Sequence, residues 1–238
     1  MLEILDTGAD SAKENMQIDS KLLEDLGSSE RPILHLYRWS KPSVSFGYFI
    51  DISKYLDMKK LKEKEIDFVR RPTGGGIVFH IWDYAFSFLM PRSHKMFSEN
   101  TLENYRFVNN VVLEALKGFL EETGLKLIGQ DANAEDLTQI NFCMAHPTKY
   151  DVVMSGKKIA GASQRKTKSG YLHQGTISVG LPKKEILKDV LLHSSILNSM
   201  LKYSFAPLGF DWDFETLEQI RDKIKQQLIQ KFRITLSE

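Results

Sequence analysis

The segment from Arg70 to His80 has the composition of a loop that binds an anion. Three successive glycines, Gly74–Gly76, stand between two strand-like runs. Because glycine has no Cβ, such a loop can approach a ligand closely and offer its N–H groups to an anion. The preceding pair, Arg70 and Arg71, suits a phosphate or a carboxylate. It is not a P-loop, since no Lys-Ser/Thr follows the glycines. From the residues alone, a glycine turn beside a surface basic pair is the alternative.

Lys158 is the second candidate. It follows a predicted hairpin turn at Ser155-Gly156 and begins a strand that continues through small residues. Its stem could therefore lie along a narrow groove, with the ammonium group inside to bind a carboxylate or to stabilise charge that develops during acyl transfer. The alternative is a solvated turn lysine, which is how we interpret neighbouring Lys157.

Cys143 and His173 are weaker candidates. Cys143 is the only cysteine, and it becomes a nucleophile only if a neighbour stabilises its thiolate; otherwise it is a small buried hydrophobe. His146 is close in sequence, but that does not establish contact. His173 begins the run His-Gln-Gly-Thr and could line a pocket, although a lone histidine is more often structural. No CxxC or HExxH spacing indicates a zinc site.

The elements that must position these residues alternate between helical and strand-like patterns. We expect helices at Asn15–Leu26, Ile52–Lys64, Leu102–Leu120 (with Gly124 ending it), Lys183–Leu201 and from Phe214 onward. We expect strands at Ile33–Trp39, Val44–Phe49, Asp67–Arg70, Ile77–His80, Tyr84–Leu89, Tyr150–Met154, Lys158–Ala162 and Gly175–Val179, with a mobile loop at Gly129–Thr138. The pattern predicts an α+β fold of one domain, a mixed sheet flanked by helices.

Composition limits the function classes. The chain has 238 residues, 42% hydrophobic and 26% charged, which suits a soluble globular protein with a sizeable core. The net charge of +1 does not indicate a nucleic acid or an anionic membrane as partner. Charges interrupt every apolar run, and the acidic N-terminus is unlike a signal peptide. With one cysteine, we expect a cytoplasmic protein.

Taken in order, several segments resemble the lipoate-protein ligase and octanoyltransferase family, which is related in fold to biotin protein ligases. The matching segments are Ala12–Asp19, Trp39–Phe49, Arg70–His80, Gly156–Ser163 and His173–Thr176. The resemblance therefore covers residues 1–180, which we expect to be the core of a single catalytic domain spanning 1–238. Residues 181–238 would be a helical C-terminal part, too short to be the large accessory domain of many ligases.

The resemblance implies a pocket for the acyl group and nucleotide, with Lys158 as the family's central lysine in contact with the acyl carbonyl and the adenylate. The residues that it implies for this pocket are Arg70, Arg71, Gly74, Gly75, Gly76, Ile77, Val78, Phe79, His80, Lys158, Gly161 and His173. It also implies lipoate or octanoate as the acyl group. The expected partners are lipoyl domains of 2-oxoacid dehydrogenase complexes and the glycine-cleavage H protein.

Two reaction routes follow from the resemblance. In the ligase route, ATP and Mg²⁺ activate lipoate to lipoyl-AMP, and Asp151 matches the acid that serves the metal. In the transferase route, Cys143 carries the acyl group from an octanoyl thioester and needs no further cofactor; Gly47–Phe49 and Gln164 are similar to that branch. Asp151 and the uninterrupted glycines narrowly favour the ligase.

A third alternative is an inactive paralogue that binds a lipoyl domain. Gln174 stands where many relatives carry a second histidine, a departure that weakens a role for His173. A ligase of this length would need a separate partner chain or would function without one.

Overall fold

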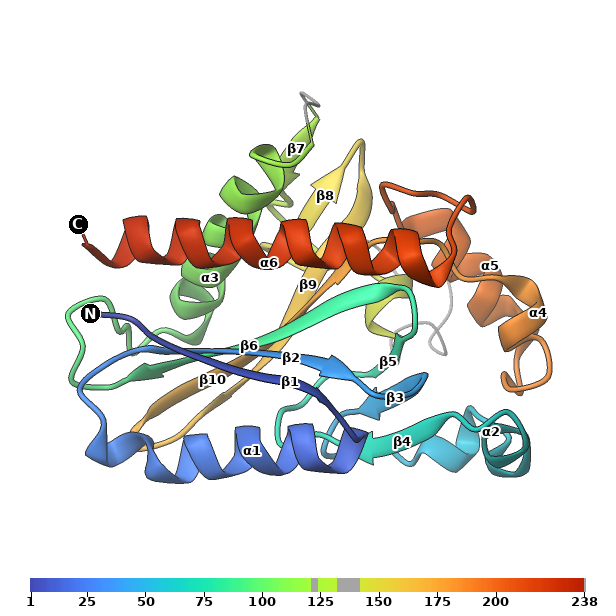
Figure 1. Ribbon diagram of the computed structural model, residues 1–238, viewed down its shortest axis with the longest axis horizontal. Coiled ribbons are helices and arrows are strands. Elements are labelled where there is room, and N and C mark those ends of the chain that lie inside the picture. The colour runs from blue at the N-terminus through green and yellow to red at the C-terminus, as the bar shows by residue number, and fades with distance from the viewer. Residues whose placement is uncertain (121–123, 132–141, 238) are drawn as a thin grey trace.

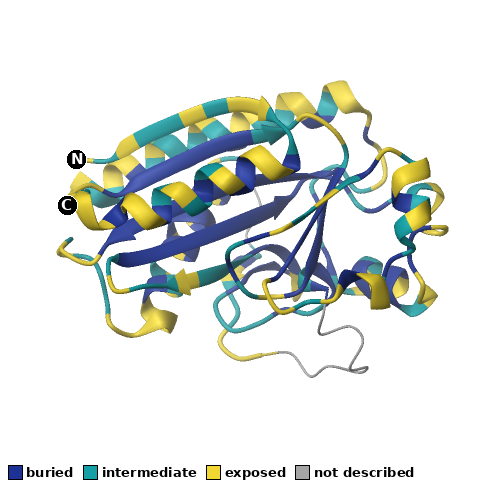
Figure 2. Cartoon of the chain, turned by 90° about the horizontal axis from the view of Figure 1, so that it is seen from below, coloured by how far each residue is buried: buried dark blue, intermediate teal, exposed yellow. Residues whose placement is uncertain are grey.

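A seven-stranded sheet forms the centre of the protein in the computed structural model, which describes residues 1–120, 124–131 and 142–237 (Figure 1). Its strand order is β1-β2-β6-β10-β9-β8-β7. The strands are β1 (Glu3–Asp10), β2 (Ile33–Trp39), β6 (Asp83–Pro91), β7 (Leu125–Leu127), β8 (Val152–Met154), β9 (Lys157–Lys166) and β10 (Gly170–Ser178). All neighbours pair antiparallel except β1 and β2. The central strands β6 and β10 are buried along their whole length, as Figure 2 shows.

A second, three-stranded sheet presents the glycine segment. Its order is β4-β3-β5, from β3 (Ser43–Phe46), β4 (Asp67–Arg70) and β5 (Ile77–His80). Residues 71–76 connect β4 to β5. Both of these strands pair with β3, so the connecting loop lies at one end of this small sheet.

Helices cover both faces of the large sheet because side chains on a strand alternate. On β6, Phe88 stacks on Phe232 of the C-terminal helix, with ring centroids 4.7 Å apart, whereas Ser87 points to the opposite face and bonds Asp19 of the first helix. The helices are α1 (Ala12–Asp25), α2 (Met58–Glu63), α3 (Thr101–Lys117), α4 (Lys184–Leu187), α5 (Ser194–Tyr203) and α6 (Phe214–Ser237). α3 packs with α6, which runs across the sheet in Figure 1.

The mixed sheet with flanking helices confirms the predicted fold class, but several boundaries differ. Asp57 caps α2 and so divides the expected helix Ile52–Lys64 into a 3-10 turn and α2. α3 ends at Gly118, before Gly124. The expected helix Lys183–Leu201 is two helices, α4 and α5. The expected loop Gly129–Thr138 lies outside the described residues after position 131.

The prediction missed β1 altogether. The strand is polar, Gly8 interrupts it with φ +71°, and its residues are half-buried or exposed at the sheet edge. Such an edge strand lacks the apolar alternation that identifies a strand in a sequence. Parallel pairing with β2 is what orders it.

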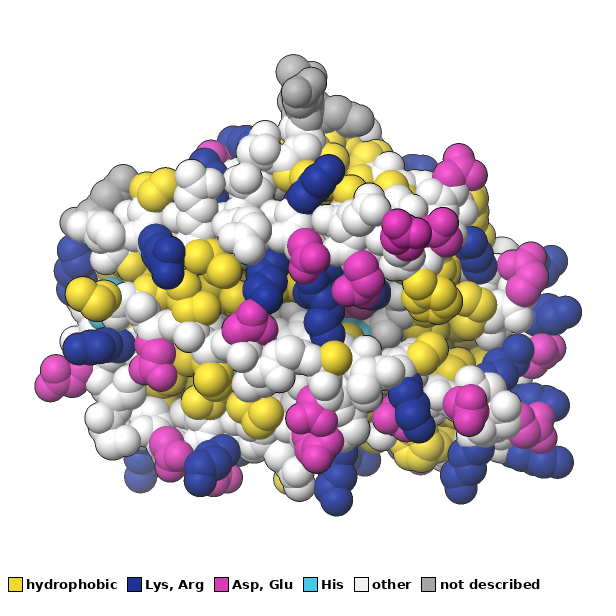
Figure 3. Space-filling model, in the orientation of Figure 1, with side chains coloured by type: hydrophobic (Ala, Val, Ile, Leu, Met, Phe, Trp, Pro, Cys, Tyr) yellow, Lys and Arg dark blue, Asp and Glu magenta, His cyan; other side chains and the backbone are white. Residues whose placement is uncertain are grey.

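The surface agrees with the small net charge. Figure 3 shows acidic and basic side chains interspersed over the face drawn, without a field of one sign. Among the described residues, none of the helices combines the length and the apolar character that a membrane crossing requires.

Candidate active site

One pocket of about 410 Å³, its open mouth included, lies where the two sheets meet α1. Its lining combines apolar side chains with a few convergent polar groups, the composition expected of a small-molecule site. The lining residues are Met16, Tyr37, Trp39, Ser45, Arg71, Val78, His80, Ala85, Cys143, Lys158, Gly161, Ala162, Ser163, Gln174, Gly175 and Thr176. The pocket therefore brings together Arg71, Cys143 and Lys158, three of the residues predicted from the sequence.

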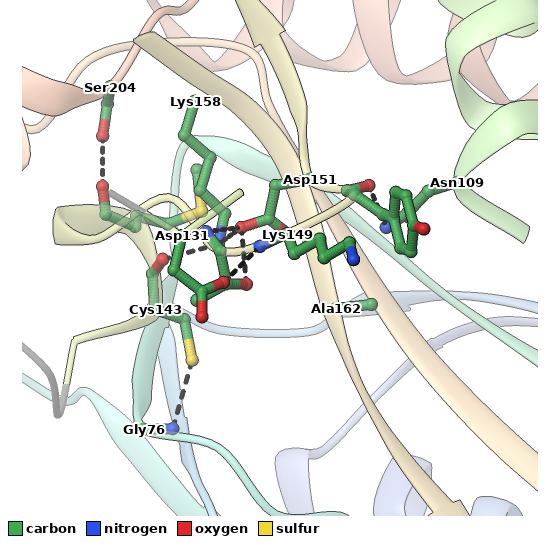
Figure 4. Close-up of polar contacts among 12 residues, drawn as sticks. Gly76, Asn109, Asp131, Cys143, Lys149, Asp151, Lys158, Ala162 and Ser204 are labelled. Carbon is green, nitrogen blue, oxygen red and sulfur yellow. Dashed lines mark hydrogen bonds and ion pairs between the residues drawn. The ribbon is translucent and has the colours of Figure 1, made fainter. Parts of the chain in front are cut away.

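Cys143 lies against hydrogen-bond donors. It begins the 3-10 turn Cys143–Ala145, and its half-buried Sγ accepts the Gly76 N–H at 3.2 Å (Figure 4). The Arg71 guanidinium is 3.8 Å from the same sulfur. A backbone N–H and a cation both stabilise negative charge on sulfur, which is the condition for a reactive thiolate. The basic neighbour is thus Arg71, not His146.

The region after β10 helps to position this cysteine. Ser204, which follows α5, donates its hydroxyl to the Met144 carbonyl at 2.8 Å. Phe142 forms a bridge with Ile77 at the start of β5. The turn that carries Cys143 is therefore fixed between the small sheet and Ser204, so the C-terminal part contributes to the support of the site.

Arg71 is a buried cation whose five donors are nearly all engaged. Nη2 donates to Gly74 O and Gly76 O at 2.9 and 2.8 Å, Nη1 to Ser45 Oγ at 3.1 Å and Nε to Ser163 Oγ at 3.2 Å. Burial lowers the pKa of Arg71, and its interaction with Cys143 opposes that shift. An arginine nonetheless keeps its charge at neutral pH, so Arg71 both shapes the glycine loop and brings a positive charge to the sulfur.

Arg70 does not reach the pocket. It is exposed, and its guanidinium bonds the carbonyls of Tyr48 and Ile50 and lies over the Phe46 ring. Successive strand residues point to opposite faces, so Arg70 and Arg71 cannot act as the clamp that the sequence suggested. The alternation also divides the expected nucleotide residues of β5: Val78 and His80 line the pocket, whereas Ile77 and Phe79 are core residues.

Close approach requires glycine at two positions, Gly75 and Gly47. Gly75 adopts φ +78°, and a Cβ there would meet the Arg71 guanidinium at 2.9 Å. Gly47 is in tighter contact still, since its Cβ would lie 2.0 Å from Gly75 O. The Gly74–Gly76 loop is thus packed against the turn after β3.

Lys158 is buried and paired inside the site. Its ammonium group lies 2.7 Å from Asp151 Oδ2 and donates to the Cys143 carbonyl at 2.8 Å, as Figure 4 shows. The hairpin turn predicted before it is present, with φ +50° at Ser155 and +81° at Gly156. Gly161 leaves the space for the lysine, because a Cβ at that position would lie 2.3 Å from Lys158 Cε.

Asp151 is saturated with donors. Tyr105 donates its hydroxyl to Oδ1 at 2.6 Å, and Thr148 donates to Oδ2 from its backbone N–H at 2.7 Å and from its hydroxyl at 3.0 Å. Burial and the Asp151 charge raise the pKa of Tyr105 well above its usual value, so this phenol stays a donor. With Lys158 as a fourth donor, the carboxylate offers no free oxygen to Mg²⁺. The described residues also contain no group of three or more His, Cys, Asp or Glu side chains placed to hold a metal ion. In this arrangement Asp151 is engaged with protein donors, and its expected magnesium role stays a prediction.

Two neighbours on β10 have opposite surroundings. His173 is fully buried on the α3 face, between Phe86 and Tyr105, and it does not line the pocket that the resemblance assigned to it. Gln174 does line the pocket, on the α1 face. It donates to Asp19 at 2.6 Å and accepts from Thr73 at 2.6 Å, which connects α1 to the glycine loop.

A hydrogen-bonded chain of Ser45, His80 and Asp83, of which Ser45 and His80 line the pocket, was not recognised from the sequence as a unit. Ser45 Oγ is 2.8 Å from His80 Nε2, and His80 Nδ1 is 2.7 Å from Asp83 Oδ2. Trp39 stacks on the imidazole, with ring centroids 4.2 Å apart. Period-two alternation along β3 and β5 was the only sequence signal that could have placed Ser45 and His80 on one face.

Comparison with known proteins identifies an enzyme of protein lipoylation. The model of the lipoyl protein ligase A/B catalytic domain matches residues 11–232, and the chain belongs to this family. The match extends well beyond residue 180, where the resemblance appeared to end, in agreement with the role of the C-terminal part in fixing Cys143.

Curated relatives of the chain include octanoyltransferases. The chain is similar to octanoyltransferase LipM of Staphylococcus aureus, with 29% identity over 205 residues that cover 85% of this chain and 74% of the relative. It is 27% identical to octanoyltransferase LipM of Carboxydothermus hydrogenoformans, over 93% of this chain and 81% of that relative.

Solved structures of similar fold include lipoate ligases. A bi-partite lipoate protein ligase from Thermoplasma acidophilum aligns with a TM-score of 0.69 at 23% identity, covering all of this chain and 84% of that one. Lipoate-protein ligase A bound with ATP aligns with a TM-score of 0.68 at 23% identity, covering 99% and 85%. At these identities the likeness is one of fold.

Proposed function

We propose that this protein is a cysteine-dependent octanoyltransferase that moves an octanoyl group from a thioester donor to a lysine of a lipoyl domain. The observation that carries the proposal is the position of the Cys143 sulfur, between the Gly76 N–H and the Arg71 guanidinium in an apolar-walled pocket. The similarity to LipM octanoyltransferases supports it.

In the first half-reaction, the Cys143 thiolate attacks the carbonyl carbon of the octanoyl thioester. A new S–C bond forms, the donor's C–S bond breaks, and the donor leaves as a thiol that takes up a proton. Exchange between thioesters is nearly balanced in energy, so no nucleotide is required. Arg71 and Gly76 stabilise the attacking thiolate, and the apolar wall formed by Met16, Val78 and Ala85 suits an alkyl chain.

In the second half-reaction, the neutral amine of the acceptor lysine attacks acyl-Cys143. The C–N bond of the amide forms, the S–C bond breaks, the amine nitrogen releases one proton to solvent, and Cys143 returns as a thiolate. Lys158 contributes a fixed positive charge beside Cys143, where the tetrahedral oxyanion develops. Asp151, with Tyr105 and Thr148, holds this lysine in one orientation.

The ATP-dependent ligase favoured in the sequence analysis is the weaker proposal. Its main support was Asp151 as a magnesium ligand, and in the structure that carboxylate is occupied by four donors. The uninterrupted glycines do not distinguish the routes, because here they contact the thiol and Arg71. An inactive paralogue is less well supported still, since the nucleophile, cations and pocket are all in place.

The acceptor is proposed to be a lipoyl domain, as in the 2-oxoacid dehydrogenase complexes and the glycine-cleavage H protein. One similar structure is described as an archaeal lipoylation system that includes the E2 lipoyl domain of that ligase. The compartment would be the cytoplasm.

The test is the intact mass of a lipoyl domain incubated with this protein under two conditions. One sample contains octanoyl acyl carrier protein without ATP, and the other contains lipoate, ATP and Mg²⁺. We expect an octanoyl mass gain in the first sample, together with an octanoyl adduct on the enzyme at Cys143. A gain confined to the second sample would establish the ligase instead, and no gain in either would favour a binding protein.

A further inference from the structure

Beside Cys143, the pocket is bordered by a second set of groups that the transferase mechanism does not use. Ser45, His80 and Asp83 form a continuous chain, Oγ to Nε2 at 2.8 Å and Nδ1 to Oδ2 at 2.7 Å. Ser45 and His80 line the same pocket as Cys143. A hydroxyl bonded to an imidazole that is in turn oriented by a buried carboxylate is the arrangement that activates a serine as a nucleophile.

The hydrogen-bond partners assign the proton positions. Arg71 donates to Ser45 Oγ at 3.1 Å and can only donate, so the hydroxyl proton of Ser45 is free to point at His80. The Asp83 carboxylate can only accept, so it takes the proton of His80 Nδ1. In its neutral form, His80 is therefore held with Nε2 as the acceptor, the tautomer that a general base needs.

The imidazole is also fixed in place. Trp39 stacks on it at an interplanar angle of 14°, and Asp83 is held by the hydroxyl of Thr176 as well as by His80. Both His80 and Asp83 are nearly fully buried, at 6% and 5% exposure. A base with this little freedom is positioned for proton transfer before a substrate arrives.

The surroundings select an acyl substrate. The Arg71 guanidinium touches both Ser45 Oγ and Cys143 Sγ, so the two nucleophiles share one cation beside one apolar-walled pocket. An acyl carbonyl that Cys143 can reach lies in the same space as Ser45. The cation is available to stabilise an oxyanion formed by attack from either side.

We propose that Ser45, His80 and Asp83 form a second catalytic centre that hydrolyses medium-chain acyl esters and thioesters. Ser45 Oγ attacks the carbonyl carbon and its proton passes to His80. The ester or thioester bond then breaks, and the leaving alcohol or thiol takes that proton. Water, deprotonated by His80, attacks acyl-Ser45, which releases the carboxylic acid and restores the serine. The net reaction consumes one water and needs no cofactor.

The centre is independent of the thiol, and its test uses the full chain with Cys143→Ala, so the cysteine cannot contribute. The first measurement is labelling by an alkyl fluorophosphonate, located by mass spectrometry of the peptide containing residue 45. We expect a covalent adduct on Ser45. Because the serine itself is unchanged, this measurement does not depend on how a Ser45 variant folds. No adduct on a protein that melts cooperatively would overturn the proposal.

The second measurement is hydrolysis of p-nitrophenyl octanoate in the same background. We expect Ser45→Ala and His80→Gln each to lower the rate by about 100-fold or more, the usual contribution of a positioned nucleophile or base. Ser43→Ala is the matched control. It is on the same strand and equally buried, but its hydroxyl bonds only Lys41 O, so we expect the rate to stay within about twofold.

Hydrolysis that persists in Ser45→Ala, or that falls equally in Ser43→Ala, would contradict the assignment. Neither outcome affects the proposed transferase, which is read from the lipoyl domain and requires Cys143. Conversely, loss of transfer in Cys143→Ala with hydrolysis retained would show two separate centres in one pocket.

Discussion

The two walls of the pocket activate their nucleophiles in different ways. On one wall, Cys143 has a cation and an N–H beside its sulfur and, among the described residues, no hydrogen bond to an imidazole. On the other, Ser45 has an imidazole backed by a carboxylate. Arg71 is the one residue common to both.

The difference follows from acidity. A free thiol is much more acidic than an alcohol, and nearby positive charge stabilises the thiolate without a dedicated base. A serine hydroxyl is far less acidic and needs a base that removes its proton during attack. Each wall thus supplies what its own nucleophile requires, and exchanging the nucleophiles should not exchange the activities.

The largest effect should come from Cys143→Ser. The hydroxyl at position 143 would have Arg71 and Gly76 but no base, because His80 is bonded to Ser45. We expect octanoyl transfer to fall by about 1,000-fold or more, as when a covalent nucleophile is removed. Initial rates from the intact mass of a lipoyl domain measure this. Cys143→Ala should be equally impaired, and a serine variant with near wild-type rate would show that a base reaches position 143.

Lys158→Ala should remove the positive charge beside Cys143 and also destabilise the fold. It leaves Asp151 as a fully buried carboxylate without its ion-pair partner, a loss that costs about 3–5 kcal/mol in comparable buried pairs. We expect that decrease in the free energy of unfolding by urea titration, together with loss of transfer.

Lys157→Ala is the control for this change, because its side chain is exposed at the neighbouring position and should leave stability and transfer nearly unchanged. The double variant Lys158→Met with Asp151→Asn removes both charges and should recover much of the stability without recovering transfer. Full activity in that double variant would show that Lys158 has only a structural role.

The surroundings of Cys143 were partly predictable because two of their segments have recognisable local sequence patterns. The glycine loop and the hairpin before Lys158 are short patterns with a direct conformational meaning, and both are present. The sequence pattern does not indicate which partner Asp151 has. As an acid it suggested a metal ligand, and only the fold shows that its carboxylate lies 2.7 Å from the Lys158 ammonium group. A sequence does not distinguish an aspartate that binds a metal ion from one that pairs with a lysine.

The chain of Ser45, His80 and Asp83 was not predictable from such local patterns. Ser45 and His80 are 35 positions apart on strands of one sheet, and Asp83 begins a strand of the other. None of these residue types is unusual in a sequence. Only the fold brings the three side chains into hydrogen-bond contact. The same limit explains why His173 was wrongly expected in the pocket. Its motif resembles a pocket motif, but strand register decides which face of β10 its side chain points to.

Gly161→Ala should displace the Lys158–Asp151 ion pair and reduce transfer less than Lys158→Ala does. The added methyl group would lie 2.3 Å from Lys158 Cε and 2.7 Å from Asp151 Oδ1, so the ion pair must shift. We expect a loss of about 2 kcal/mol in unfolding free energy, typical of overpacking, and a smaller drop in transfer than for Lys158→Ala. Gly129→Ala is the control, since a Cβ there has no neighbour within 4 Å. Equal effects of the two changes would contradict a packing role for Gly161.

The smallest effect concerns His173, which lies behind the pocket on neither wall. Burial lowers its pKa to about 3, whereas an unfolded histidine titrates near 6.5. Its contribution to stability is therefore fully present above pH 6.5 and is lost as the pH falls toward 3, because only the unfolded chain takes up the proton. Between pH 6.5 and 5.5 this amounts to about 1 kcal/mol.

Urea titrations of the wild type and His173→Phe over that pH range measure the difference in slope. We expect the variant to lose less stability on acidification than the wild type, whatever its stability at pH 7. The exposed residue His193, changed to Gln, should leave the slope as it is. A slope unchanged in His173→Phe would mean that His173 takes up a proton in the folded protein, which requires a polar or solvated path to its ring and would return it to the functional site.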